Sequence, residues 1–238
     1  MIPFFKMISR GFGSLIGLFW PAHCALCGSR TERLPICEDC LSELECETAR
    51  FCSECGGRHI SNACRAHPSP LCPYFVPAFK FCDKTRDMIH LLKYSGRRDI
   101  GALLGEMVHT RISADGIIAN ADMLVPVPLH KIKHRDRGFN QSEVMADRIS
   151  KLSGIPVLSR GVNRMKHTPS QTKLNAKERQ ANVAGVFEIN IDLSGKKLII
   201  IDDVITTGAT IRELASAILR VGGQISCAAC VAHPGLDD

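Results

Sequence analysis

The sequence has few aromatic side chains: its 238 residues include one Trp, two Tyr and ten Phe. Proteins that bind single-stranded nucleic acid usually stack the bases on aromatic rings, so this scarcity argues against a dedicated single-strand binding domain. The sequence has no Walker motif, which argues against a P-loop nucleotide site. A composition of 45% hydrophobic and 23% charged residues is typical of a globular protein, and the net charge of +6 indicates affinity for anions.

The sequence also lacks a convincing signal peptide or membrane-spanning run. Residues 1–20 are mostly apolar, but Lys6 and Arg10 interrupt them and no clear cleavage site follows. We expect an amphipathic segment that packs on the next module, with a membrane-surface anchor as the alternative. The chain is therefore expected to be cytoplasmic and not transmembrane, and in the cytoplasm clustered cysteines usually indicate metal sites.

Twelve cysteines are present, and ten of them lie between Cys24 and Cys82. The first four form two CxxC pairs, Cys24 with Cys27 and Cys37 with Cys40, separated by the length of a short hairpin. Each pair places two thiolates on one ion, and two pairs complete a tetrahedron. This spacing predicts a structural zinc site.

A second cluster begins with the pair Cys52 and Cys55. Cys64 and His67 have the spacing of a partner pair with one imidazole ligand, but Cys72 is an alternative fourth ligand, so the choice stays open. Closed sites with four protein ligands leave no position for substrate. Zinc here is therefore expected to support folding rather than catalysis.

One further CxxC pair, Cys227 with Cys230, is not expected to bind metal. The segment 224–232 reads as a buried strand, and residues three apart on a strand face opposite sides of the sheet. These two cysteines are expected to be small buried apolar residues.

The most informative segment is the apolar run Leu198–Ile201, which ends in the adjacent carboxylates Asp202 and Asp203. A loop of hydroxyl-bearing and small residues follows, and then a helical pattern begins. Free backbone N–H groups at a helix N-terminus favour a phosphate, and two carboxylates suit the hydroxyls of a sugar. The segment therefore predicts a site for a ribose 5-phosphate. Its loop consists of Val204, Ile205, Thr206, Thr207, Gly208, Ala209 and Thr210.

The rest of the chain alternates between helical and strand patterns. Four prolines between Pro68 and Pro77 indicate a linker that leads out of the cysteine-rich region. Expected helices cover about 84–94, 100–108, 140–152 and 211–219, and expected strands cover 123–129, 156–158, 187–191, 197–201 and a final segment that ends at His233. This order predicts an α/β fold with a parallel sheet covered by helices, whose ligands bind at the carboxyl ends of the strands.

Two polar segments are candidates for binding anions. A dense basic run follows the apolar strand at Pro126–His130; it comprises Lys131, Lys133, His134, Arg135 and Arg137. The long stretch from Arg160 to Ala181 has no clear periodicity, and loops of this length inside a domain are usually functional or disordered. A solvated loop is the alternative for the basic run.

The segment IDDVITTGAT resembles the signature with which type I phosphoribosyltransferases bind phosphoribosyl pyrophosphate (PRPP). The whole chain is similar to the ComF family, also called the competence-protein-F or GntX-like group. The matching pieces occur in family order: CALC, CEDC, CSEC, IHLLKYSG, VPVPLH, RDRGFNQ, the stretch that contains Gln171, Arg179, Asn182 and Val183, and IDDVITTGAT. After the amphipathic segment expected over 1–20, the resemblance implies a double zinc ribbon over 21–75 and a type I phosphoribosyltransferase-like domain over 76–238.

The resemblance also implies site roles. The loop residues from Val204 to Thr210 would hold the 5-phosphate, and the two aspartates would hold the ribose hydroxyls and stabilise an oxocarbenium-like sugar. Arg135 and Arg137 would contact the pyrophosphate, Mg²⁺ would bridge pyrophosphate and sugar, and Arg179 would lie on a mobile flap that closes over the site.

Two functions of different classes follow from the resemblance. The first is an enzyme of nucleoside metabolism that transfers a phosphoribosyl group to an unidentified nitrogenous acceptor. The second is a non-catalytic protein that senses PRPP or binds single-stranded DNA beside the competence machinery of DNA uptake. The paired aspartates favour the enzyme, because binding a phosphate alone requires no carboxylates for ribose.

Overall fold

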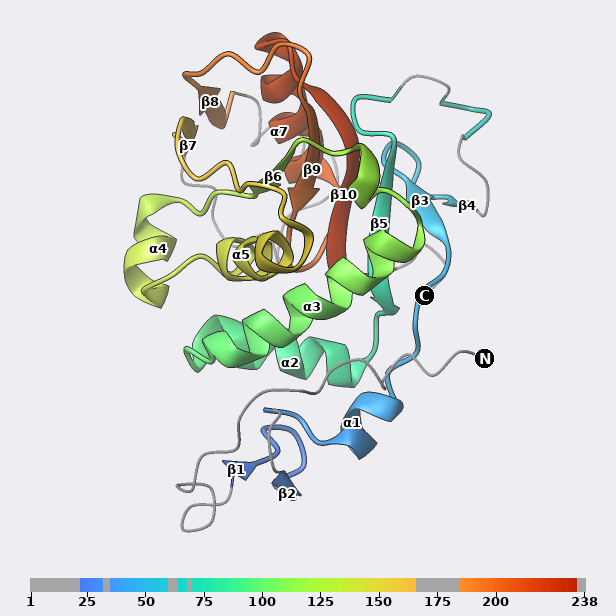
Figure 1. Ribbon diagram of the computed structural model, residues 1–238, viewed down its shortest axis with the longest axis vertical. Coiled ribbons are helices and arrows are strands. Elements are labelled where there is room, and N and C mark those ends of the chain that lie inside the picture. The colour runs from blue at the N-terminus through green and yellow to red at the C-terminus, as the bar shows by residue number, and fades with distance from the viewer. Residues whose placement is uncertain (1–21, 32–34, 60–63, 68–69, 166–184, 235–238) are drawn as a thin grey trace. The chain divides into compact units, whose positions relative to one another are not determined.

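The computed structural model describes residues 22–31, 35–59, 64–67, 70–165 and 185–234 (Figure 1). Residues 1–20 and Arg179 lie outside these ranges, as does most of the expected flap. The chain divides into two compact units, Met1–Glu43 and Leu44–Asp238. The sequence predicted one module over 21–75 that contains both cysteine clusters. In the structure, the boundary between the two units falls between the first cluster and the second.

The smaller unit contains little regular structure. Strands β1 (Ala22–His23) and β2 (Arg30–Thr31) pair antiparallel, and a short helix α1 (Glu38–Ser42) follows. Gly28, at the turn between the strands, has a φ of +75°, which glycine adopts without a Cβ penalty.

The larger unit is built on a six-stranded sheet in the order β4-β3-β5-β10-β9-β6. Four of its strands run parallel: β5 (Tyr74–Lys80), β10 (Gln224–His233), β9 (Lys197–Ile201) and β6 (Met123–Pro126). Strands β3 (Arg50–Cys52) and β4 (Arg58–His59) extend this sheet by antiparallel pairing beyond β5. The expected α/β fold is confirmed, with an antiparallel edge that the sequence did not predict.

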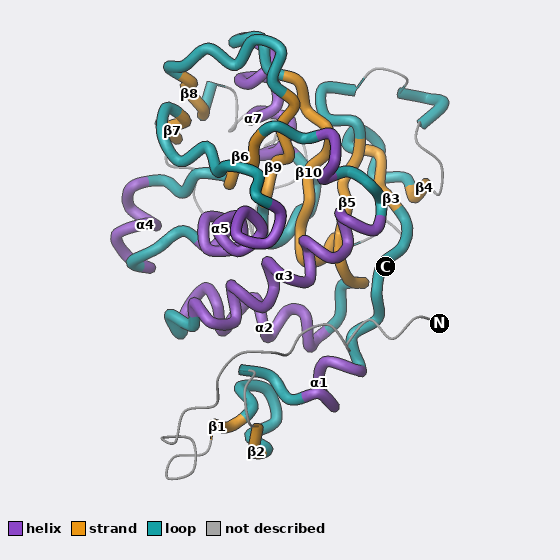
Figure 2. Tube along the Cα trace, in the orientation of Figure 1, coloured by secondary structure: helices purple, strands orange, loops and turns teal. Residues whose placement is uncertain are grey.

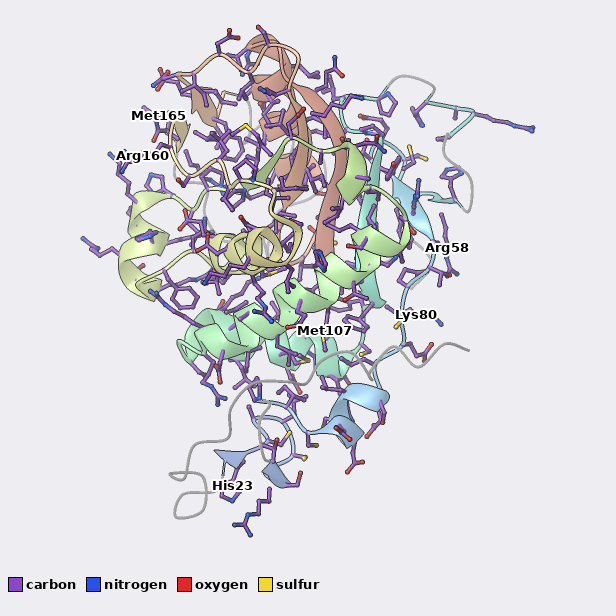
Figure 3. All side chains as sticks on the ribbon, in the orientation of Figure 1. His23, Arg58, Lys80, Met107, Arg160 and Met165 are labelled. Carbon is purple, nitrogen blue, oxygen red and sulfur yellow. The ribbon has the colours of Figure 1, made fainter. Side chains whose placement is uncertain are left out.

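Helices cover both faces of this sheet (Figures 1 and 2). Helices α2 (Asp83–Tyr94), α3 (Arg98–Ala114) and α5 (Gln141–Ser153) lie on one face, and α7 (Ala209–Arg220) lies on the other. Because both faces are covered, Leu198–Ile201 of β9 is completely buried. Met107 of α3 is likewise buried, whereas Arg58 on β4 is exposed and pairs with Glu47 at 2.7 Å (Figure 3).

Shorter elements complete the unit. The 3₁₀ turn η2 (Ile118–Asn120) precedes β6, and β7 (Val162–Arg164) pairs antiparallel with β8 (Phe187–Ile189). The basic run after β6 forms a short helix, α4 (Lys131–Arg137), which ends at Gly138 in the left-handed conformation. Within the described part of the chain, none of the helices has the length and apolarity that a membrane crossing requires.

The main error of the sequence interpretation is β5. Pro77 and the prolines before the strand indicated a linker, but β5 pairs with β10 along most of its length. Five of its residues are buried: Phe75, Val76, Pro77, Ala78 and Phe79. Burying a large apolar side chain contributes about 2 kcal/mol, which exceeds the roughly 1 kcal/mol of the hydrogen bond that Pro77 cannot donate. The strand expected at 156–158 is reduced to a single bridge between Val157 and Leu124.

Candidate functional site

The two aspartates lie where β9 ends, at the carboxyl edge of the sheet. The backbone N–H of Asp202 donates to the carbonyl of Ala229 (3.0 Å), and the N–H of Val231 donates to the carbonyl of Asp203 (3.0 Å). These bonds extend the pairing with β10 past the end of β9 and fix both backbones. Their carboxylates accept local N–H bonds, Asp202 from Asp203 (2.9 Å) and Asp203 from Val204 (2.8 Å).

The two carboxylates have different partners. Asp203 is 8% exposed, and its Oδ2 lies 2.7 Å from Nζ of Lys93 in the last turn of α2. Asp202 accepts a bond from Oγ of Ser142 (3.1 Å) and has no such direct ion pair among the described residues. Burial, together with the neighbouring charge of Asp203, raises the pKa of Asp202 to about 7. Lys93 therefore compensates the charge of Asp203, whereas a cationic ligand would stabilise the charged form of Asp202.

The loop from Val204 to Thr210, called here the phosphate loop, follows the aspartates directly. Thr206 and Thr207 are exposed, and Gly208 has a φ of +70° at the N-cap of α7. Gly208 offers no side-chain cap, so the first N–H groups of α7 keep no intrahelical partner. The loop has the donors and the helix dipole that a phosphate requires.

Cations gather in a cavity of about 280 Å³ between the end of α2 and α4. Its lining includes Lys93, Lys133 and Arg137, with Tyr94 and Asp136 beside them. Burial and the nearby charges of Arg164, Arg137 and Lys93 lower the pKa of Lys133. An anion in this cavity would relieve the repulsion among these cations.

The two arginines that the sequence predicted to bind an anion lie in different surroundings. Arg137 lines the cavity, and its Nη1 donates to Oε1 of Gln141 (3.2 Å). Arg135 is largely exposed and lies 3.8 Å from the carboxylate of Asp136. The sequence reasoning did not select Lys93 as a site residue, although it lies in the IHLLKYSG segment. The signal that would have identified Lys93 is its position at the end of the predicted helix, shortly before Gly96.

Asn140 connects this region to the aspartates. It caps α5 by accepting from the N–H of Ser142 (3.1 Å), and its Nδ2 donates to the carbonyl of Val127 after β6 (3.0 Å). Asn140 is buried, so both bonds are shielded from water. The cap thereby places Ser142 against Asp202.

The first cysteine cluster, Cys24, Cys27, Cys37 and Cys40, lies in the smaller unit, and its four Sγ atoms lie within 4.8 Å of one another. Tetrahedral zinc with Zn–S bonds of about 2.3 Å requires sulfur atoms about 3.8 Å apart. The Sγ atoms of Cys27 and Cys37 are 3.6 Å apart. Although burial opposes it, backbone hydrogen bonds from Cys27 and Cys37 lower the pKa of Cys24 to about 6, which favours a thiolate ligand. These residues fit zinc.

The second cluster lies in the larger unit and consists of Cys52, Cys55, Cys64 and His67. The Sγ atoms of Cys55 and Cys64 are 3.9 Å apart, and Nδ1 of His67 lies 3.7 Å from Cys52 Sγ and 3.5 Å from Cys64 Sγ. The hydrogen bond from His67 lowers the pKa of Cys64 to about 6. Both the spacing and the donor set fit a zinc ion.

Cys72, the alternative ligand, lies outside this group. It is completely buried, its Sγ contacts the carbonyl of Tyr74 (3.7 Å), and burial raises its pKa to about 12. Its surroundings therefore favour the neutral thiol, and the geometry favours His67 as the fourth ligand. Cys227 and Cys230 are completely buried in β10.

Comparison with known proteins gives consistent results. Residues 112–236 match the family described as the phosphoribosyl transferase domain. The DNA utilization protein YhgH of Escherichia coli (strain K12) is 30% identical over 227 residues, which cover 87% of this chain and 96% of that protein. Competence protein F of Haemophilus influenzae is 25% identical and covers 84% of this chain and 85% of its own length. Competence protein ComFC of Bacillus subtilis is 27% identical and covers 80% of each chain.

Proposed function

The chain belongs to the phosphoribosyl transferase domain family, in the group that includes competence protein F, and on this premise we propose that it binds PRPP and transfers the phosphoribosyl group to a nitrogenous acceptor. The observation that carries this proposal is the arrangement at one edge of the sheet. Asp202 and Asp203 lie between a loop suited to a phosphate and a cavity lined by cations.

Each part of this edge suits one part of PRPP. The N–H groups of the phosphate loop, with the hydroxyls of Thr206 and Thr207, would hold the 5-phosphate. The aspartates would accept hydrogen bonds from the ribose 2- and 3-hydroxyls. The pyrophosphate would lie among Lys93, Lys133 and Arg137, where three cations balance its charge. Arg135, expected from the sequence to contact pyrophosphate, and Arg179, expected to lie on the flap, remain secondary candidates in this proposal.

The chemistry requires stabilisation of opposite charges. As the bond to pyrophosphate breaks, positive charge grows on the sugar, and the carboxylates of Asp202 and Asp203 would stabilise it. Lys93 would stabilise the leaving pyrophosphate while it keeps Asp203 ionised. Carboxylate oxygens are the ligands that Mg²⁺ prefers, and a bound Mg²⁺ would offset the charge of the pyrophosphate.

A second candidate, a DNA-binding or PRPP-sensing accessory protein, is supported by the names of the relatives, which refer to competence and DNA utilization. The basic helix α4 and the exposed ring of Tyr94 beside Arg137 would suit a nucleic-acid strand. Such binding would weaken steeply as salt rises, whereas PRPP turnover would release pyrophosphate.

Titration calorimetry with PRPP and Mg²⁺, followed by an acceptor screen that measures pyrophosphate release, tests the proposal. We expect binding by the wild-type chain and at least about 100-fold weaker turnover in Asp202→Asn and Asp203→Asn, with circular dichroism unchanged. Arg220→Gln is the matched control, because Arg220 lies in the last turn of α7 and has no role in this proposal, and it should change binding far less than Arg137→Gln. Absence of PRPP binding by zinc-loaded, folded protein at millimolar ligand would overturn the proposal.

A further inference from the structure

The second cysteine cluster lies beside the phosphate loop. A cavity of about 210 Å³ separates the two, and its lining comes from both. The cluster contributes Ser53–Gly56, the turn that contains its ligand Cys55, and the loop side contributes Thr206, Thr207, Ala209 and Arg212. Phe75 and His233 complete the lining.

Arg212 joins the two sides directly. Its Nη1 donates to the carbonyl of Ser53 (2.5 Å), and its backbone N–H donates to the carbonyl of Gly208 (2.9 Å). Ser53 is buried between the ligands Cys52 and Cys55, and its hydroxyl donates to the carbonyl of Cys72. One side chain therefore connects the backbone of the metal-binding turn to the first turn of α7.

A second connection runs through aromatic rings. Phe51, the residue before Cys52, packs edge-on against the ring of His233 at 4.7 Å between centroids. His233 is 5% exposed, and its Nδ1 lies 2.5 Å from the carbonyl of Ile205 in the phosphate loop. Because the carbonyl can only accept, Nδ1 is the donor. Through Phe51 and His233, strand β3 is therefore connected to the phosphate loop at Ile205.

Gly208 leaves no room for the loop to shift toward the sheet. A Cβ on Gly208 would lie 2.3 Å from Cζ of Phe75 and 3.1 Å from Nη1 of Arg212. The loop is thus packed against the same two residues that line the cavity. Movement of the metal-binding turn would therefore be transmitted to the loop through Arg212.

We propose that a metal ion at the second cluster positions the phosphate loop, with Arg212 and His233 as positioning residues, so that Zn²⁺ and the sugar phosphate bind with positive coupling. This inference rests on the proposed function. A bound ion fixes the turn from Cys52 to Cys55 against the pair Cys64 and His67, and the fixed turn holds the carbonyl that Arg212 requires. Coupling is reciprocal, so PRPP must tighten zinc binding by the same factor.

The test uses the full-length zinc-loaded chain and two matched pairs of variants. Cys64→Ser removes one ligand of the second cluster without touching β3, and Cys27→Ser removes an exposed ligand of the first cluster. Arg212→Ala cuts the connection and keeps every ligand, and Arg220→Ala removes an arginine from the last turn of the same helix. The measurements are zinc content, Kd for PRPP with Mg²⁺, zinc retention against a competing chelator with and without PRPP, and amide hydrogen exchange of residues 204–210.

We expect Cys64→Ser and Arg212→Ala to raise the Kd for PRPP about 10-fold and to speed exchange in the phosphate loop. Cys27→Ser and Arg220→Ala should change neither. In the wild-type chain, PRPP should slow the loss of one zinc ion, and in Arg212→Ala this protection should disappear although the zinc content is unchanged. A purely structural role of Arg212 would not remove that protection.

Several outcomes would overturn the inference. Equal PRPP affinity in all variants would overturn the positioning role alone and leave the proposed function standing. A wild-type chain without PRPP binding would overturn the proposed function and the coupling together. If Cys64→Ser does not fold, Arg212→Ala and the chelator competition decide the question, because both use chains with intact clusters.

Discussion

Each cysteine cluster brings its four ligand atoms within 4.8 Å of one another, but the two clusters belong to units with very different cores. In the described part of the smaller unit, the buried apolar residues are Cys24, Ile36, Cys37, Cys40 and Leu41, three of which are ligands. The larger unit buries a sheet between helices, and its second cluster lies at the edge of that sheet. A bound metal would replace a hydrophobic core in the smaller unit, whereas in the larger unit a bound metal would be free to shape a neighbouring site.

The largest expected effect comes from removing zinc. Structural zinc contributes about 10 kcal/mol to the folding of small ribbon modules. We therefore expect a chelator, or Cys40→Ser, to unfold residues 22–43 while the larger unit keeps its sheet. Hydrogen exchange measured by mass spectrometry checks this, since amides of β9 and β10 should stay protected.

Elemental analysis gives the matching control: two zinc ions per chain are expected, and one after Cys40→Ser. If chelation unfolded both units in a single transition, the contrast between the clusters would be wrong.

Substitutions at two glycines allow the turns of the two units to be compared. Gly28 and Gly208 both have positive φ, but a Cβ on Gly28 meets nothing within 4 Å, whereas one on Gly208 meets the ring of Phe75. Gly28→Ala should cost about 1 kcal/mol from the left-handed conformation alone. Gly208→Ala should cost about 3 kcal/mol because the overlap adds to that strain.

Urea unfolding of each variant measures both costs. Equal losses of stability would mean that Phe75 moves away freely, and the packing argument for the phosphate loop would lose its support.

The pKa of Asp202 provides a pH-dependent contrast. Because its pKa is raised from 3.8 to about 7, the folded protein binds a proton more tightly than the unfolded chain between these values. The wild-type stability should therefore fall as pH rises through this window. Asp202→Asn removes the penalty, so it should stabilise the larger unit at pH 8 and change its stability little below pH 4.

Thermal unfolding at the two pH values tests this. The smaller unit should not respond, and a variant that is less stable than the wild type at pH 8 would contradict the assigned cause. Together with lost PRPP binding, a gain in stability would identify a carboxylate that is retained for function.

A small effect is expected from the ligand. PRPP at ten times its Kd should stabilise the unit that binds it by about 1.4 kcal/mol. We expect this gain in the larger unit alone, as a shift of its unfolding transition. Stabilisation of residues 22–43 by PRPP would show that the two units share the site.

Much of the fold followed from local patterns. The strand at Lys197–Ile201 and the helix that begins at Ala209 agree with the sequence interpretation, because an apolar run, two acids and a helical pattern act over short distances. Strand β5 was mistaken for a linker because Pro77 and the prolines before it are a local signal, whereas its burial between β10 and β3 is not. The pairing of β7 with β8 was also missed, because it is a contact between two segments and no local pattern encodes it.

The sequence by itself determined the chemistry that spacing controls: the cysteine pairs, the adjacent aspartates and the phosphate loop. These features lie within a few residues of one another, so the backbone geometry of one turn or one strand end fixes them. Only the tertiary structure brought Lys93 to Asp203, selected His67 over Cys72, and joined the second cluster to the loop through Arg212. Those contacts link segments far apart in the chain, and sheet order and helix packing, which no local pattern encodes, decide which of them meet.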